Sequence, residues 1–248
     1  MEILGIDIGG SGIKGAPVNI KTGKLLAEKL RISTPKPSSP QKVAEVVCQL
    51  VQHFNWKGPV GCGFPTIMVK GTAMAASNMG NKWVGVNVEE LFRKQTGLHF
   101  RVINDADAAG LAEMTWGVGK EKMGIVIMIT IGTGLGSGFF YDGKLIPNFE
   151  LGHIPHTNGD PIEFYAADSA RKKEKLGYDE WGKRFDYFLN RVVRLFSPDL
   201  IIIGGGASKK FDKFKDQITI NVPIEVAKAT NQAGITGAAL AAYDFLNT

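Results

Sequence analysis

The sequence is poor in cysteine and has no long apolar run. It contains only two cysteines, Cys48 and Cys62, among 248 residues, which excludes a disulfide framework. Neither has the close Cys or His neighbours that a zinc site needs, so we expect both thiols to be reduced and mostly buried. No segment reaches the roughly 18 uncharged apolar residues of a membrane span, and the first residues lack the basic region and apolar core of a secretory signal. We therefore expect a cytoplasmic protein with no membrane partner.

The composition is that of a globular protein with a small excess of positive charge. Hydrophobic residues make up 44% of the chain and charged residues 21%, which excludes a disordered, collagen-like or coiled-coil protein. A chain of this length buries a sizeable core. The 29 basic and 24 acidic side chains give a net charge of +5, which favours an anionic partner and leaves nucleic acid, polyphosphate and nucleotides open.

The first half of the sequence predicts a β-meander followed by alternating helices and strands. The expected strands cover residues 3–8, 13–18, 24–32, 60–64 and 100–103. One apolar helix face begins with Ser39 as N-cap and Pro40 in the first turn. Asn87 and Glu90 predict a capping box for a second helix, which ends near Gly97.

The second half repeats this order of elements. We expect strands over residues 125–131, 139–141 and 200–203, a hairpin at Asp142 and Gly143, and a helix along residues 181–196. The order of meander, helix, strand and helix thus occurs twice, each time with a glycine-rich turn near its start. This pattern predicts an α/β protein made of two similar lobes that face a cleft.

The first glycine-rich turn is suited to binding phosphate. Gly9, Gly10 and Ser11 follow Asp7, and glycines let phosphate oxygens approach backbone amides without a Cβ in the way. Asp7 can hold a hydrated magnesium ion and Lys14 can neutralise phosphate. The alternatives are a tight hairpin without a ligand and a solvated strand lysine.

The second glycine-rich turn, over residues 132–138, is similar to a dinucleotide fingerprint but runs into a strand. A Rossmann turn opens a helix, so that interpretation is excluded. Two glycine-rich hairpins suit a phosphate chain held from both sides, and purely structural glycines are the alternative.

Three further side chains have the chemistry of a hydroxyl-binding site. Asp105 follows a strand and begins a helix, where its carboxylate can accept a proton from a hydroxyl or act as a helix cap. Glu150, His153 and His156 are spaced like metal ligands, but Pro155 prevents the helix that would align the two histidines. We consider a loop that presents Glu150 and His153 to sugar hydroxyls, with a structural histidine as the alternative.

In combination and in this order, the motifs resemble those of the ROK family of sugar kinases, whose fold is the two-lobed actin and hexokinase fold, related to ribonuclease H. The resemblance covers the chain from Leu4 to its end. Within the family, the segments 63–66, 77–79, 83–85, 104–109 and 231–238 are similar to those of the bacterial polyphosphate glucokinases.

The resemblance implies a role for each motif. Asp105 is expected to be the general base on the sugar 6-hydroxyl. The residues implied to hold the other hydroxyls are Asn78, Asn104, Glu150, His153 and Glu163. The residues implied to bind the phosphoryl donor are Asp7, Gly9, Gly10, Ser11, Lys14, Thr133, Gly134, Gly204, Gly205 and Gly206, with Asp7 near a hydrated magnesium ion that it does not bind directly.

The resemblance also implies the organisation of the protein and its partners. A small lobe is expected over residues 1–105, completed by a C-terminal helix over 234–248, and a larger lobe over 106–233. Many relatives carry a cysteine-rich zinc loop after the Gly-His motif, but residues 156–161 contain no cysteine, so we predict no structural zinc. A homodimer is expected. Repressors of the family carry a DNA-binding segment before the kinase-like part, whereas this sequence enters its first expected strand at Glu2, so we expect no nucleic-acid partner.

The expected function is phosphorylation of glucose at O6, with mannose as a possible second sugar, from inorganic polyphosphate and also ATP with Mg²⁺. The alternatives are a strictly ATP-dependent hexose or acylated-hexose kinase and a catalytically silent sugar-binding regulator. The distribution of charge is consistent with polyphosphate as a donor, because basic residues are clustered over residues 171–175, 183–184 and 209–215. A solvated charged face is the alternative for these clusters.

Overall fold

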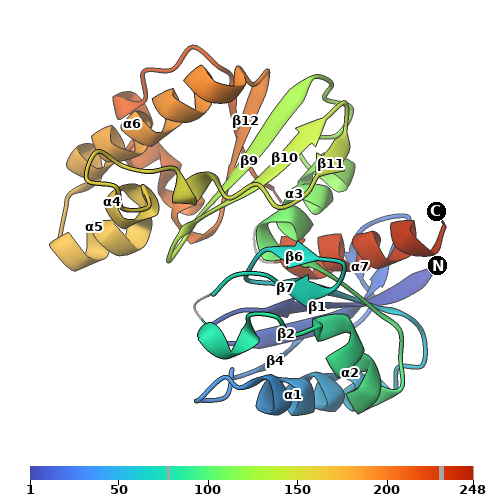
Figure 1. The fold of residues 1–248 in the computed structure, drawn as a ribbon. Coiled ribbons are helices and arrows are strands. Elements are labelled where there is room, and N and C mark those ends of the chain that lie inside the picture. Colours follow the sequence, from blue (N-terminus) through green and yellow to red (C-terminus); the bar gives the residue numbers. More distant parts are fainter. Residues whose placement is uncertain (77–78, 229–231, 248) are drawn as a thin grey trace. The chain divides into compact units, whose positions relative to one another are not determined.

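The computed structural model describes residues 1–76, 79–228 and 232–247, and it divides into two compact units (Figure 1). Unit 1 comprises Met1–Ala112 with Asn231–Thr248, and unit 2 comprises Glu113–Thr230. The division falls inside helix α3 (Asp105–Trp116), seven residues after the boundary that we predicted.

Unit 1 is built on a sheet of order β3-β2-β1-β5-β8, with β4 paired to β2 as well. Its strands are β1 (Glu2–Ile8), β2 (Ile13–Asn19), β3 (Lys24–Leu25), β4 (Leu30–Ile32), β5 (Val60–Phe64) and β8 (Phe100–Asn104). β1 is antiparallel to β2 and parallel to β5, which is parallel to β8. A small hairpin, β6 (Met68–Val69) with β7 (Thr72–Ala73), and a 3₁₀ turn, η1 (Asn81–Trp83), follow β5.

The prediction of one continuous strand over residues 24–32 is wrong, because two short strands pair with β2 there. The interruption lies beside Pro17 of β2. The carbonyl of Pro17 accepts the Leu26 amide at 2.9 Å, so this side of Pro17 faces the third strand. Proline has no N–H, so β2 lacks a hydrogen-bond donor at Pro17, between the residues that pair with β3 and those that pair with β4.

The predicted helix starts in unit 1 are confirmed, with two differences at the caps. α1 (Pro40–His53) begins as expected, but the Ser39 side chain makes no capping hydrogen bond. α2 (Val88–Thr96) is capped by Asn87, whose side chain accepts the Glu90 amide at 2.8 Å, and it ends at Gly97 with φ +75°. The Glu90 carboxylate binds Arg93 rather than completing a capping box.

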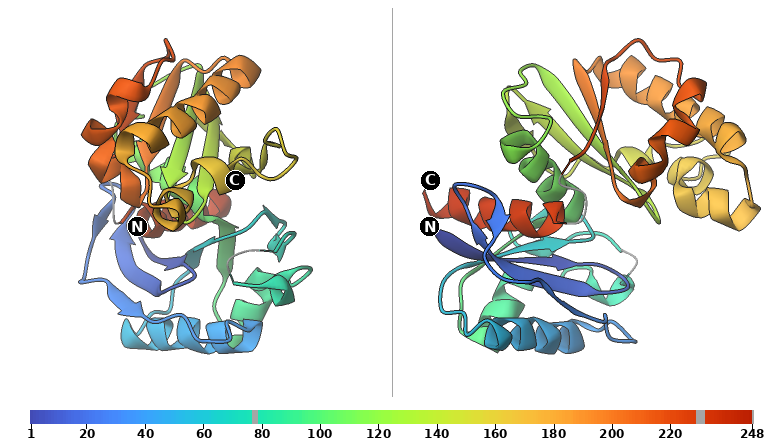
Figure 2. Two further views of the ribbon diagram at one scale, coloured as in Figure 1. Left: turned by 90° about the vertical axis from the view of Figure 1, so that its left-hand side faces the viewer. Right: turned by 180° about the vertical axis from the view of Figure 1, so that it is seen from behind.

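The C-terminal helix α7 (Ala233–Leu246) packs on the sheet of unit 1 with almost no space between backbones. It covers the face opposite α1 (Figure 2). A Cβ on Gly5 of β1 or on Gly61 of β5 would collide with the carbonyl groups of Ile235 and Ala238 in α7. A Cβ on Gly237 of α7 would collide in the same way with Ala108 of α3. Glycine at these positions therefore sets how closely α7 approaches β1, β5 and α3.

Unit 2 repeats the sheet pattern of unit 1, with the order β11-β10-β9-β12-β13. Its strands are β9 (Ile125–Ile131), β10 (Leu135–Tyr141), β11 (Lys144–Ile146), β12 (Leu200–Gly204) and β13 (Ile224–Val226). β9 is antiparallel to β10 and parallel to β12. The predicted turn over residues 132–138 is too long, because β10 already begins at Leu135 and its last two glycines lie within the strand.

One amphipathic helix supplies most of the helical core of unit 2. The helical elements are α4 (Glu163–Ala166), α5 (Asp168–Glu174), α6 (Tyr178–Phe196) and the 3₁₀ segments η2 (Leu151–His153), η3 (Gly206–Lys213) and η4 (Lys215–Gln217). Trp181, Phe185, Phe188 and Val192 of α6 are fully buried against the sheet, as the helical stripe predicts.

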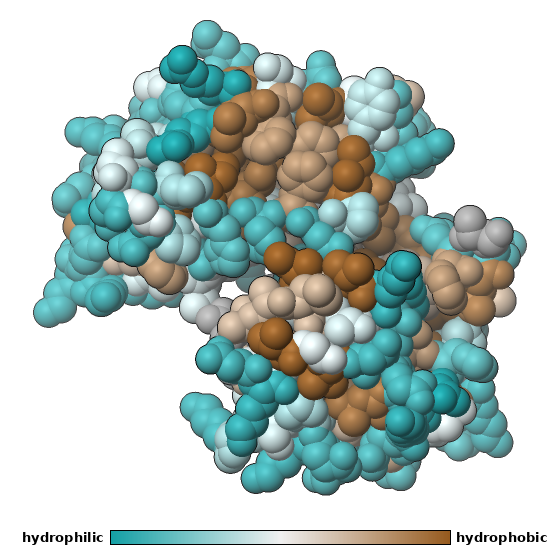
Figure 3. Space-filling view, in the orientation of Figure 1, coloured by the Kyte–Doolittle hydropathy of each residue, from teal (hydrophilic) through white to brown (hydrophobic). Residues whose placement is uncertain are grey.

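The surface of each unit combines hydrophilic regions with exposed apolar side chains. Figure 3 shows apolar side chains over the β10–β11 and β6–β7 hairpins, where Ile146, Val69 and Met74 are exposed. Within the described residues, no helix is long and apolar enough to cross a membrane. Both cysteines are free thiols, and burial, together with the charges of Asp7 and Glu89, raises the pKa of the Cys62 thiol.

The close packing of α7 makes a prediction for stability. We expect Gly61→Ala to lower the free energy of unfolding by about 1–3 kcal/mol or more, because its Cβ meets the rigid backbone of α7. Gly58→Ala is the matched control, since its Cβ would lie at an ordinary 3.5 Å from the Trp56 ring. Urea unfolding of both variants measures the difference, and equal midpoints would contradict the packing constraint.

Candidate functional site

The predicted site residues of unit 1 lie at one edge of its sheet. Parallel strands end at the same edge, and the register places Asp7 of β1 beside Gly63 of β5 and Phe64 beside Asn104 of β8. A Cβ on Gly63 would lie 3.5 Å from the Asp105 Cα. Asp7 and Asp105 therefore belong to the same carboxyl-end edge, which is where open α/β sheets bind ligands.

Asp7 lies close to one lysine and to the N-terminus of α7. The register pairs it with Lys14, and the Lys14 Nζ lies 3.3 Å from Asp7 Oδ2. On its other side is the first turn of α7, where a Cβ on Gly234 would lie 2.8 Å from the Asp7 Cγ. The N-terminus of a helix carries a partial positive charge, so α7 also favours the Asp7 carboxylate.

Side chains from outside the first glycine turn, those of Arg31 and Thr34, bind its backbone carbonyls. Its own closing bond runs from the Gly9 amide to the Gly12 carbonyl at 3.1 Å. The Thr34 hydroxyl donates to the Gly9 carbonyl and the Arg31 guanidinium donates to the Ser11 carbonyl at 2.9 Å. Thr34 and Arg31 were not predicted, since they belong to a segment that has no motif of its own.

Asn104, and not Asp105, caps α3. The Asn104 Oδ1 accepts the amides of Ala106 and Asp107 at 2.8 and 3.1 Å, and its Nδ2 donates to the Thr66 carbonyl at 3.1 Å. The N-cap position of α3 is thus occupied by Asn104, one residue before Asp105. Asn104 is buried and Asp105 only partly so, and the sugar contact of Asn104 stays a prediction.

In unit 2, the two predicted donor-binding segments lie side by side at one edge of the sheet. Gly204 of β12 is registered with Thr130 of β9, directly before the turn over residues 132–134. Gly205 has φ +80°, and a Cβ there would lie 2.5 Å from the Ile131 carbonyl oxygen. No atom lies within 4 Å of the Cβ positions of Gly132 and Gly206, so the backbone is open to a ligand at both.

Glu163 ties the second glycine turn to the Glu150–His153 loop. Its Oε2 accepts the Leu135 amide at 3.0 Å, and its Oε1 lies 3.7 Å from His153 Nε2. A Cβ on Gly134 would collide with this carboxylate, and one on Gly152 would crowd it at 3.3 Å. One side chain thus contacts a predicted donor-binding turn and a predicted sugar-binding histidine.

Ser137 fixes the backbone on both sides of Glu150. Its hydroxyl donates to the Phe149 carbonyl and accepts the Leu151 amide at 3.0 Å, and the serine is only 2% exposed. Burial raises the pKa of the Glu150 carboxyl, His153 opposes this shift and the Glu163 charge adds to it. Ser137 was not predicted, although a polar residue in an otherwise apolar and glycine strand was a signal for it.

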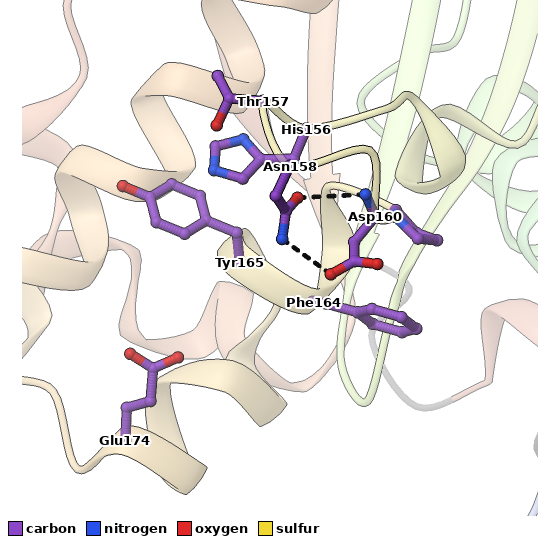
Figure 4. Close-up of a pocket in the computed structure, with 8 residues that line it drawn as sticks. His156, Thr157, Asn158, Asp160, Phe164, Tyr165 and Glu174 are labelled. Atoms are coloured by element: carbon purple, nitrogen blue, oxygen red, sulfur yellow. Dashed lines mark hydrogen bonds between the residues drawn. The ribbon is translucent and has the colours of Figure 1, made fainter.

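A pocket of about 300 Å³ in unit 2 contains none of the predicted site residues. Its lining includes His156, Asn158 and Tyr165, and the His156 ring stacks on Tyr165 at 4.4 Å between centroids (Figure 4). The Asn158 carboxamide closes the loop by binding Asp160 at 2.8 Å. No group of three or more His, Cys, Asp or Glu residues that could hold a metal occurs among the residues described.

The structure thus gathers the predicted residues into one group in each unit. Asp7, Lys14, Asn104 and Asp105 share the sheet edge of unit 1, where the turn over residues 9–12 also lies. The group in unit 2 consists of Thr133, Gly134, Glu150, His153, Glu163 and the glycines 204–206. Asn78 lies outside the described residues.

Two units with the same sheet order, each with functional groups at the carboxyl ends of its strands, define the actin and hexokinase-like class of α/β proteins. The predicted fold class is confirmed. The ROK family model matches residues 3–164, and the chain belongs to the ROK family.

Individual relatives are similar over nearly the whole chain. The chain is 39% identical to the polyphosphate glucokinase of Mycobacterium tuberculosis strain CDC 1551 / Oshkosh, over 96% of this chain and 90% of that protein. It is 41% identical to the inorganic polyphosphate/ATP-glucomannokinase of Arthrobacter sp. strain KM, whose crystal structure superposes with a TM-score of 0.93 and covers 100% of this chain and 99% of that one. A ROK family glucokinase from Streptomyces griseus, in complex with glucose and AMPPNP, is 23% identical with a TM-score of 0.85 over 98% and 100% of the two chains, which shows the shared fold.

The buried carboxylate of Glu150 makes a prediction for the pH dependence of stability. A carboxyl whose pKa is raised on folding stabilises the folded state at low pH, and this contribution is lost as the pH rises through its folded pKa. We therefore expect the melting temperature of Glu150→Gln, measured relative to that of the wild type, to rise as the pH is raised from acid to neutral. Glu225→Gln, at an exposed position on β13, is the control. A melting-temperature difference that does not change with pH would contradict the burial of the Glu150 charge.

Proposed function

We propose that this chain transfers a phosphoryl group from inorganic polyphosphate to the 6-hydroxyl of glucose. The observation that carries the proposal is the position of Asp105 at the start of α3, on the same sheet edge as the Asp7–Lys14 pair. The relatives support the donor and the acceptor, because polyphosphate glucokinase and polyphosphate/ATP-glucomannokinase are the activities that name them.

Asp105 is proposed as the general base. A carboxylate that accepts the hydroxyl proton makes the sugar oxygen a better nucleophile as the bond to phosphorus forms. Asn104 caps α3 and donates to the Thr66 carbonyl. These two contacts fix the backbone at the start of α3, where Asp105 is located. Asn104 acts as a positioning residue in this respect.

Glu150, His153 and Glu163 are proposed to hold the other sugar hydroxyls. A carboxylate accepts hydroxyl hydrogen bonds, and a neutral imidazole both donates and accepts them. Ser137 supports Glu150 by fixing the backbone on either side of it. The Glu163 carboxylate supports His153 and the Leu135 amide together.

The donor phosphates are proposed to bind the glycine segments, Lys14 and Thr133. Exposed backbone amides without a Cβ suit phosphate oxygens, and Lys14 supplies positive charge. Mg²⁺ usually keeps several waters and binds through one or two carboxylates plus the phosphates of the substrate. Asp7 lies beside the turn, where it would contact the hydration shell of the ion without binding the ion directly, and the ion would supply charge neutralisation on the donor phosphates.

ATP is proposed as a second donor and mannose as a second sugar, because one relative is named as an inorganic polyphosphate/ATP-glucomannokinase. A strictly ATP-dependent hexose or acylated-hexose kinase is the alternative. A silent sugar-binding regulator is a weaker alternative, because the chain retains Asp105 at its expected position. A homodimer, a cytoplasmic location and the lack of structural zinc stay predictions.

Removal of the proposed base makes the first functional prediction. We expect Asp105→Asn to lower kcat on the order of a hundredfold to ten-thousandfold while the protein stays folded, because general-base catalysis contributes about this much. Asp216→Asn, an exposed aspartate on η4, is the control with the same chemical change. The assay follows glucose 6-phosphate formation, and a variant that keeps about a tenth or more of the wild-type kcat would refute the role of Asp105.

The sugar-binding group makes the second functional prediction. His153→Ala is expected to raise the KM for glucose by an amount that corresponds to about 1–3 kcal/mol of binding free energy, because a buried sugar hydroxyl loses its hydrogen-bond partner. The KM for the donor should change little. His99→Ala replaces an exposed histidine of unit 1 and serves as the control. A glucose KM equal to that of the control variant would remove His153 from the sugar site.

A further inference from the structure

Two basic segments of unit 2 are connected to the proposed donor-binding segments. The Ser169 hydroxyl near the start of α5 donates to the Thr133 carbonyl, which ties this helix to the second glycine turn. The other segment, η3, begins at Gly206. Residues 168–184 and 206–216 together carry ten basic and six acidic side chains, a net charge of +4 out of +5 for the whole chain.

These two segments meet at one aromatic ring. The Arg171 guanidinium carbon lies 4.5 Å from the Tyr178 ring centroid, and the Lys213 Nζ lies 5.4 Å from the same centroid. Phe214 is stacked parallel to this ring, with 6.4 Å between centroids. Arg171 and Lys213 at this ring, together with Lys172, Lys173 and Lys210, which are their neighbours in sequence, are called the Tyr178 surface below.

The six acidic residues of these two segments, among them the exposed Asp179, Glu180 and Asp216, do not cancel the ten basic ones, so the segments keep a net positive charge. Asp168 accepts contacts of 2.7 Å from both Arg171 and Lys172, so one carboxylate faces two cations. Lys173, Lys210 and Lys213 are exposed and form no ion pair within the described part of the chain. The nearby carboxylate of Glu174 is held by Arg184 at 2.7 Å, and that of Asp212 by Lys215 at 3.0 Å.

We propose that the Tyr178 surface binds the part of a polyphosphate chain that extends beyond the phosphates held by the glycine segments. This inference rests on the proposed function. A long chain held at Thr133 and Gly206 would continue along α5, which Ser169 ties to Thr133, and along η3, which begins at Gly206, whereas we expect a donor of three phosphates to end before these basic residues. Binding at this surface releases counterions from the chain and is therefore sensitive to salt.

The same contacts favour polyphosphate over a nucleic acid. Single-stranded nucleic acids bind through aromatic rings on which their bases stack. The Tyr178 ring is covered by the Arg171 guanidinium, with Lys213 and Phe214 also against it. The surface therefore presents cations for a phosphate chain, and its partly buried Tyr178 ring already contacts Arg171 and Lys213, which makes it a poor platform for base stacking.

The test combines three lysine substitutions on the surface with three elsewhere. Lys173→Gln, Lys210→Gln and Lys213→Gln are made together, and Lys172 is kept because it neutralises the buried Asp168. The control combines Lys21→Gln, Lys42→Gln and Lys57→Gln, exposed residues of unit 1 that give the same change in net charge. KM is measured for long-chain polyphosphate and for tripolyphosphate over a range of salt concentrations, and binding of labelled long-chain polyphosphate is measured without glucose.

We expect the surface variant to weaken long-chain binding roughly tenfold or more and to lower its salt slope by about 2, since each lost phosphate contact removes about 0.7 from the slope. The KM for tripolyphosphate should change far less, and the control variant should match the wild type with both donors. Equal effects of the two variants on long-chain binding would overturn the proposal, as would equal competition by single-stranded DNA of the same charge. The binding arm needs no turnover, so a wild type that binds long-chain polyphosphate at this surface without phosphorylating glucose would refute the proposed function alone.

Discussion

The packing of α7 on β1 and β5 is the constraint on which the geometry of unit 1 depends. Gly5, Gly61 and Gly237 remove the Cβ atoms that would separate the helix from β1, β5 and α3. Because α7 lies so close, its first turn reaches the Asp7 carboxylate at Gly234, and α3 is held where Asp105 sits over Gly63. Residues from the two ends of the sequence thus fix the edge that carries both aspartates. A helix that packs through backbone contacts has little freedom to shift, and such rigidity suits phosphoryl transfer, in which positioning and charge neutralisation supply most of the rate acceleration.

Unit 2 reaches a similar result with hydrogen bonds instead of close backbone packing. Ser137 holds the backbone on both sides of Glu150, and Glu163 holds the Leu135 amide and faces His153. Burial of Glu150 has a cost for the free protein, because a carboxylate with a raised pKa is harder to keep ionised at neutral pH. In the proposed function, a sugar whose hydroxyls donate to this carboxylate would offset that cost when it binds.

Local sequence patterns predicted most elements and the order of the motifs. The apolar stripe of α6 and the continuous apolar run of β9 are strong periodic signals, and Gly97 marks the end of α2 as expected. The patterns failed where the cause lies elsewhere in the chain. Pro17 of β2 lies beside the gap between β3 and β4. Asn104 and Asp105 are both good helix caps in isolation, and only the structure shows that Asn104 takes this position. Arg171 and Lys213 contact the same Tyr178 ring, although neither is next to Tyr178 in the sequence. Ser137 illustrates the same limit, since its importance comes from Phe149 and Leu151 across the fold.

The most direct test of the central claim is a donor screen with the purified wild-type protein. Glucose and Mg²⁺ are incubated with long-chain polyphosphate or with ATP, and glucose 6-phosphate is detected by a coupled dehydrogenase assay with the matching no-donor control. Transfer from polyphosphate is the predicted result, with or without additional transfer from ATP. Formation of glucose 6-phosphate from ATP alone would contradict the polyphosphate assignment, and no product from either donor would contradict the assignment of a glucose kinase.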